Sequence, residues 1–318
     1  MRTFAMNKPF LSFSLALCLL GASAAVATPA EAAPPPAVAF RMPAKPFAAL
    51  RTDVAKARSI DPRAFAQVGS IVSHAADADA RARGRKAPVA LYLAKLGPSA
   101  LMPMLEMLAL DPPRGVPAAS APALRRDLIE AVGLLKDARA LPVLEAILAD
   151  PTEDADTTRT VTEAVARVGT NEAATHILTA LDASTGDRTR AIVAGMGECR
   201  RVRVTEALAS RIRTTGDEAT ARVAARSLGR AGNAWAWKTV ADRSEEARVR
   251  ETAARALVDA FARRDGEARV AASNALMVVD APQTPALIAE ARKGASPELA
   301  KALDALAARF AKNPARVQ

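Results

Sequence analysis

Residues 221–240 read ARVAARSLGRAGNAWAWKTV. Their apolar side chains have the spacing of one helix face up to residues 229–232, and a second helical run begins after Asn233. Residues 129–148, IEAVGLLKDARALPVLEAIL, show the same order of helix, glycine and helix. A pair of short helices cannot bury its apolar face alone, so a chain that repeats such pairs is expected to stack them.

The composition indicates which residues would fill the core of this stack. Hydrophobic residues make up 50% of the 318 residues, but aromatic residues supply only 3%. The core must therefore consist of Ala, Leu, Val and Ile, and Ala has the highest helix propensity. Stretches with the β-branched and aromatic alternation of strands are almost absent. The sequence therefore predicts an all-α protein.

Five glycines follow apolar stretches, and the spacing from one to the next fits a unit of two helices and two turns. The residue beyond a helix end often takes a positive φ, which glycine adopts without strain. We therefore expect these five to mark helix ends: Gly97, Gly133, Gly169, Gly197 and Gly229.

An arginine precedes the glycine, or the leucine in its place, by seven positions in several units: Arg126, Arg190, Arg222, Arg250 and Arg269. This pattern resembles the D-x-x-V-R-x-x-A-x-x-A-L-G pattern of HEAT repeats, particularly the short type of phycocyanobilin-lyase-like proteins, over about residues 86–312. The resemblance implies an α-solenoid, a superhelix of stacked helical hairpins that holds other molecules. It also implies that these arginines pair with acids of the adjacent repeat and so set the stacking register.

Two positions depart from the pattern. The second unit has Thr162 at the arginine position, with Arg159 one turn earlier. Arg250 and Arg269 lie closer together than any other neighbours in the series, so a shortened unit or an altered stacking angle is expected between them.

Residues 1–27 have the features of a secretory signal. Arg2 and Lys8 precede an apolar run that is followed by small residues. Cleavage is expected after Ala27, with Ala24 as the alternative, which predicts export to the periplasm or cell envelope. After cleavage Cys199 is the only remaining cysteine, so no disulfide within the chain is expected.

The mature chain divides by composition into four further parts. Residues 28–47 are rich in Pro and Ala and are interpreted as a linker. Residues 48–85 are expected to form an N-terminal helical cap, in which Asp61-Pro62 marks a helix start. The repeat solenoid covers residues 86–312, and residues 313–318 form a C-terminal tail.

No arrangement of residues predicts catalysis. His74 and His176 are the only histidines and have no cysteine nearby, whereas a zinc site needs about four ligands in tight geometry. Cys199 has only His176 as a base within one repeat, so a structural thiol at a helix end is preferred over a nucleophile. We expect no catalytic residue, metal or cofactor.

The formal charge of +10 favours an anionic partner. Residues 186–230 hold ten arginines against five acids, and Arg81, Arg83, Arg85 and Lys86 form a second basic cluster. Helical spacing places Trp237 in the core and Trp235 on the other side, either as an exposed anchor or packed against the next repeat. Partner contacts are therefore expected from the arginines in the turn and following helix and from this tryptophan: Arg200, Arg201, Arg203, Arg211, Arg213 and Trp235.

These features together predict an exported, non-enzymatic HEAT-repeat scaffold that binds a protein or an anionic component of the envelope. One alternative is a HEAT-like enzyme, similar to bilin lyases or DNA glycosylases. Another is a module that binds anionic lipid. Nucleic acid is not expected as the partner of an exported protein.

Overall fold

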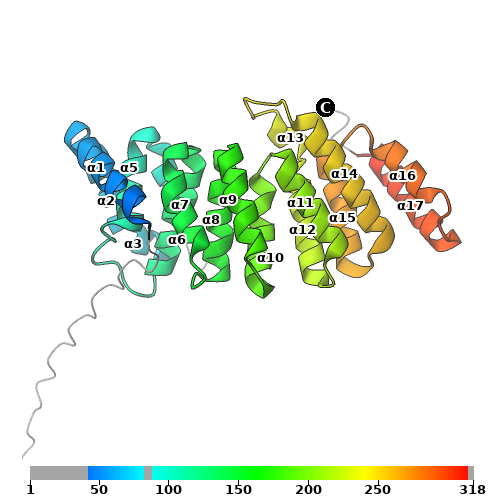
Figure 1. Cartoon of the computed structure of the whole chain (residues 1–318), viewed down its shortest axis with the longest axis horizontal. Helices are drawn as coiled ribbons and strands as arrows, with labels where there is room; N and C mark the ends of the chain where they lie inside the picture. Colours follow the sequence, from blue (N-terminus) through cyan, green and yellow to red (C-terminus); the bar gives the residue numbers. More distant parts are fainter. Residues whose placement is uncertain (1–41, 82–87, 314–318) are drawn as a thin grey trace, which may run out of the picture. The chain divides into compact units, whose positions relative to one another are not determined.

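Helices of the expected lengths lie side by side along the chain (Figure 1). The computed structural model describes residues 42–81 and 88–313, all of which lie in one unit. These residues are all-α and contain no strand. The prediction of an α-solenoid of stacked helical hairpins is confirmed.

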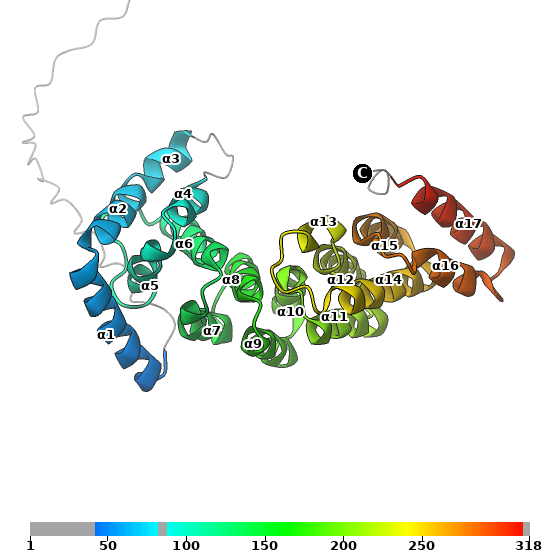
Figure 2. The same cartoon turned by 90° about the horizontal axis from the view of Figure 1, so that it is seen from above.

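The helices form two layers, visible in Figure 2, and each helix contacts the next one in its own layer. The first layer contains α4 (Val89–Lys95), α6 (Ala121–Leu135), α8 (Ala155–Val168), α10 (Gly186–Gly195), α12 (Glu218–Ala231), α15 (Gly266–Val279) and α17 (Pro297–Ala311). The second contains α5 (Leu101–Ala109), α7 (Leu141–Ala149), α9 (Asn171–Asp182), α11 (Val202–Thr214), α14 (Glu246–Arg263) and α16 (Thr284–Arg292). Short 3₁₀ turns, η1 (Pro98–Ala100), η2 (Ala138–Ala140) and η3 (Met196–Glu198), enter the links between the layers.

Neighbouring helices of the first layer run parallel. Arg222 near the start of α12 pairs with Glu267 near the start of α15, and Gly232 just after α12 adjoins Val279 at the end of α15. This arrangement follows from the hairpins, because each chain reversal through the second layer returns the next helix in the same direction.

The cap before the stack is helical, as predicted, but begins earlier than expected. It comprises α1 (Ala44–Ile60), α2 (Pro62–Ser73) and α3 (Ala75–Arg81), and α1 and α2 contact α4 and α5. Residues 44–47, predicted to be linker, form the first turn of α1. Asp61 begins α2 as predicted, because its Oδ1 accepts the N–H of Ala64 at 3.1 Å.

Several predicted features lie outside the described residues. These are the signal sequence and its cleavage sites, the linker up to residue 41, residues 82–87 with most of the second basic cluster, and the tail after residue 313. Among the helices that are described, none combines the length and the apolar character needed to cross a membrane.

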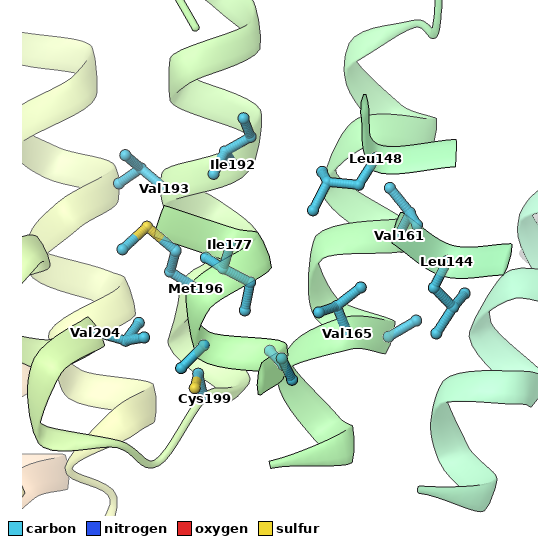
Figure 3. Packing of buried hydrophobic residues seen from close by; sticks show 14 of the residues in the cluster. Leu144, Leu148, Val161, Val165, Ile177, Ile192, Val193, Met196, Cys199 and Val204 are labelled. Atoms are coloured by element: carbon cyan, nitrogen blue, oxygen red, sulfur yellow. The ribbon is translucent and has the colours of Figure 1, made fainter. Parts of the chain in front are cut away.

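The core lies between the two layers and is built from aliphatic side chains, as the composition predicts. Figure 3 shows Leu144 and Leu148 of α7 near Val161 and Val165 of α8. Trp237 is the largest fully buried side chain in the described chain, and it packs in a small separate cluster with Val202 and Val249. It belongs to α13 (Ala234–Trp237), a short helix inserted between α12 and α14.

Candidate functional site

The five glycines predicted to end helices fall into two groups. Gly97 and Gly169 do follow helix ends, with φ of 77° and 74°. The prediction is wrong for Gly133 and Gly229, which lie inside α6 and α12. Gly197 does follow the end of α10, but it lies in η3 and has no positive φ.

These three glycines allow neighbouring first-layer segments to approach closely. A Cβ on Gly133 would lie 2.5 Å from the Cα of Ala164 in α8. A Cβ on Gly229 would lie 2.9 Å from the Cβ of Ala275 in α15, and one on Gly197 would lie 3.0 Å from the Cα of Ser227 in α12. Packing between helices, rather than backbone conformation, is the reason for glycine at these positions.

The arginine seven positions before each of these glycines lies on the same helix face, two turns away. Arg126 Nη1 lies 4.0 Å from Asp154, the N-cap of α8, and Arg190 Nη1 lies 3.3 Å from Asp217, the N-cap of α12. Arg222 pairs with Glu267 in the first turn of α15. Each arginine thus meets an acid at the start of the next first-layer helix, where the helix dipole also favours negative charge.

The other two arginines of the series make different contacts. Arg250 belongs to α14, in the second layer, and donates to the carbonyl of Asp280 at 2.7 Å. Arg269 donates to the carbonyl of Phe261 at 2.9 Å. The prediction of a shortened unit between them is therefore wrong. Arg250 and Arg269 are close in the sequence because they lie on consecutive helices of different layers, α14 and α15.

Thr162 has a packing reason to replace arginine. Its side chain is fully buried, and a Cβ on Gly195 of α10 would lie 2.5 Å from the Cβ of Thr162. An arginine cannot occupy this contact between α8 and α10.

Two of the predicted partner-binding arginines, Arg200 and Arg201, make contacts within the fold. Arg201 Nε donates to the carbonyl of Gly169 at 2.7 Å, and its Nη1 donates to Glu245 Oε1 at 2.8 Å. Glu245 also accepts the N–H of Val202 at 2.6 Å, at the start of α11. Because the segment after α13 folds back over this turn, Arg201 joins three elements of the fold.

Arg200 lies beside a half-buried ion-pair network around Glu198 and Arg230. Burial raises the pKa of Glu198, but the charges of Arg230 and Arg167 outweigh it and hold that pKa below its ordinary value. Burial lowers the pKa of Arg200, against the attraction of Glu198. The network connects α8, η3 and α12, since Arg230 also donates to Glu163 at 3.1 Å.

The remaining predicted contact residues are more accessible. Arg203 is exposed and donates to Thr175 Oγ1 at 3.0 Å, Arg211 is half-buried, and Arg213 is exposed. Trp235 is 49% exposed, and Lys238 Nζ lies 3.6 Å from its ring centroid.

The thiol and imidazole groups are placed for structure. Cys199 is buried, and burial raises the pKa of its thiol to about 12. His176 Nδ1 lies 3.0 Å from Glu145 Oε1, and His74 Nδ1 lies 2.8 Å from the carbonyl oxygen of Ser70. Over residues 42–81 and 88–313, no three His, Cys, Asp or Glu side chains are grouped so that they could hold a metal ion.

A groove of about 650 Å³ lies between α12 and α15. Its floor consists of small residues, Gly229, Ala271 and Ala275, because the two helices approach most closely there. The walls are the longer side chains on either side of this contact. A close helix crossing therefore produces an open groove above it.

The two walls differ in chemistry. Arg222, Arg226 and Arg230 stand one turn apart along α12. On α15, Val270 is 59% and Val278 is 43% exposed, with the exposed Asn274 between them. A basic wall thus faces a wall on which the exposed Val270 and Val278 alternate with Glu267 and Asn274.

The charge of the groove is only partly compensated. Arg222 pairs with Glu267 within the groove, and Arg230 pairs with Glu163 and Glu198 behind it. Arg226 is exposed, and the described structure gives it no ion pair. On the α15 side, Arg309 of α17 donates to Asn274 Oδ1 at 2.7 Å and Ser273 Oγ at 2.6 Å, both uncharged.

Sequence reasoning included Arg222, Arg226 and Arg230 in the basic stretch but missed the valines that complete the groove. The available signal was the position of Val270 and Val278, which are two helical turns apart on a face away from the buried Ala268, Ala272 and Leu276. Apolar residues on both sides of one helix indicate a second contact surface.

No family model and no curated protein matches the chain. A chain of human deoxyhypusine hydroxylase, in complex with glycerol, is similar to it at 17% identity and a TM-score of 0.33, covering 78% of this chain and 97% of that one.

Proposed function

We propose that this protein is an exported, non-enzymatic α-solenoid that binds a protein partner through the exposed side of its first layer. The groove between α12 and α15 is the observation that carries the proposal, because it combines exposed apolar side chains with an arginine, Arg226, that has no ion pair in the described structure. Adjacent apolar and polar walls of this kind are typical of interaction surfaces.

The export part of the proposal rests on residues 1–27, where Arg2 and Lys8 precede an apolar run and the small residues up to Ala27. Fractionation of cells, followed by N-terminal sequencing of the protein, tests it directly. A mature chain that begins at Thr28 in the periplasmic or envelope fraction supports export. A chain that retains Met1 in the cytoplasm contradicts it.

The scaffold part is tested by capture from an envelope extract on the immobilised mature chain. Val278→Glu places a charge on the apolar wall of the groove and is expected to remove the captured protein. Ile60→Glu is the matched control, because Ile60 is a 72% exposed apolar residue at the end of α1, outside the groove.

Both substitutions replace an exposed apolar side chain, so both variants are expected to melt within about 2 °C of the wild type. Capture that is lost in both variants, or in neither, contradicts the groove as the binding site. Capture that only Val278→Glu removes supports it.

A further inference from the structure

The α12–α15 groove has a length and a charge pattern that restrict what it can hold. Its lining runs from Gly266 to Val278 along α15, which at 1.5 Å per residue is on the order of 18 Å. That length matches about three turns of a helix. Helix-in-groove binding places an apolar stripe of one helix into a trough formed by others.

Along one wall the apolar contacts repeat with helical geometry. Val270 and Val278 are two turns apart, about 12 Å. A helix laid along the groove presents side chains at i and i+7 or i+8 with the same separation. One apolar stripe of such a helix therefore meets both valines.

The arginines on the α12 wall favour an acidic ligand. Arg222, Arg226 and Arg230 recur at every fourth position, so carboxylates at i, i+4 and i+8 of a bound helix lie opposite them. Arg309 does not line the groove, but it bonds the lining residue Asn274 and has no carboxylate partner in the described structure, so it adds positive charge beside the α15 wall. Glu267 pairs with Arg222, and Glu163 and Glu198 pair with Arg230 from behind, so Arg226 is the arginine of this wall whose charge is left for a ligand.

We infer that the groove binds an amphipathic helix of a partner protein, with an apolar stripe beside an acidic one. This inference rests on the proposed function and specifies its partner. Single-stranded nucleic acid fits less well, because no aromatic residue lines the groove for base stacking. A lipid surface is flat, whereas the valines here form one wall of a trough whose floor is Gly229, Ala271 and Ala275.

The test places a photo-crosslinking amino acid, p-benzoylphenylalanine, at position 278 of the mature chain. After irradiation in envelope extract, the crosslinked species is digested and the attached segment is sequenced. The expected product is a protein segment with Asp or Glu at helical spacing next to an apolar stripe. The same crosslinker at position 60 serves as the positional control and is expected not to attach this segment.

Two charge reversals test the basic wall. Arg226→Glu in the crosslinking background is expected to lower the yield about tenfold, since it replaces an attraction with a repulsion. Arg63→Glu makes the same change in net charge at an exposed arginine of α2, outside the groove, and its yield is expected to stay within about twofold. Equal effects of the two reversals overturn the inference.

Other outcomes separate this inference from the scaffold proposal. A crosslinked segment that is neutral or basic, or a crosslinked phospholipid or nucleic acid, overturns the acidic helix. If position 278 yields no crosslink while capture still depends on Val278, the acidic helix is wrong and the scaffold stands. If both the crosslink and the capture are absent, both proposals fail.

Discussion

Replacing Gly133 with alanine tests whether the first layer depends on close contact between its helices. The new Cβ would lie 2.5 Å from the Cα and 2.7 Å from the Cβ of Ala164, against about 3.4 Å for an ordinary contact. Because the nearest atom is backbone, no side-chain rotation relieves the clash, and α6 and α8 must separate by about 1 Å.

The two contributions to the free energy of unfolding have opposite signs. Overpacking of this kind costs about 3 kcal/mol, at the upper end of the usual range, because backbone has to move. Alanine inside a helix regains about 1 kcal/mol over glycine. The net expectation is a loss of about 2 kcal/mol, or about 4–8 °C in the melting temperature of a unit of this size.

Gly69→Ala is the matched control. Gly69 also lies inside a helix, α2, but a Cβ there meets no atom within 4 Å. Only the helix-propensity gain remains, so this variant is expected to be stabilised by up to about 1 kcal/mol.

Thermal and urea unfolding followed by circular dichroism at 222 nm measure both variants. A double variant, Gly133→Ala with Ala164→Gly, should recover only part of the loss, because the contact with the Cα of residue 164 persists. If Gly133→Ala melts at or above the wild-type temperature, close helix contact is not the reason for glycine at this position.

Three further predictions concern single side chains. Arg201→Ala is expected to lower the free energy of unfolding by about 2 kcal/mol, because it leaves Glu245 and the Gly169 carbonyl without their donor. Arg203→Ala is expected to change it by at most about 0.5 kcal/mol. If Arg203→Ala is the more destabilised of the two in urea unfolding, a structural role for Arg201 is contradicted. Burial raises the pKa of Cys199 to about 12, so a disulfide reagent at neutral pH should label the thiol only after unfolding. The folded form keeps the thiol proton above the ordinary pKa of 9.0, whereas the unfolded form loses it there. The free energy of unfolding of the wild type should therefore fall, relative to Cys199→Ala, as pH rises from 9.0 to about 12. Glu198 has the opposite pH dependence, because its pKa is lowered in the folded form. It stabilises the fold above the ordinary pKa of 4.5, and this stabilisation is lost as pH falls. Acid unfolding of Glu198→Gln should therefore depend less on pH below 4.5 than that of the wild type, and equal slopes contradict this account.

The repeating helices were predictable because local spacing determines them. Apolar periodicity, the Asp61 N-cap and the scarcity of aromatic residues each act within a short stretch of the chain. The role of Gly133, Gly197 and Gly229 was harder to predict, since a glycine after an apolar run fits both a helix end and a helix crossing. An arginine seven positions before the glycine favours a helix crossing over a helix end, because residues i and i+7 lie on the same face of one helix.

Other features depend on contacts between residues far apart in the sequence. Arg201 bonds Gly169 and Glu245, which lie far from it on either side along the chain, so its structural role is visible only after folding. Its neighbours in the sequence suggested an exposed basic turn. Arg250 fits the repeat pattern by spacing, although it belongs to a helix of the other layer, because the insertion that holds α13 displaces the series.

The contact of each first-layer helix with the next one also bears on how the protein responds to force. A load applied between its two ends passes through one helix crossing after another, several of them held by a glycine contact and some also by an arginine–carboxylate pair. Because every crossing bears the same load, the weakest one opens first, and the other crossings keep their contacts while it opens. Pulled slowly, the chain should lengthen in steps of about one hairpin, and a stretched stack could close again from any pair that stayed intact.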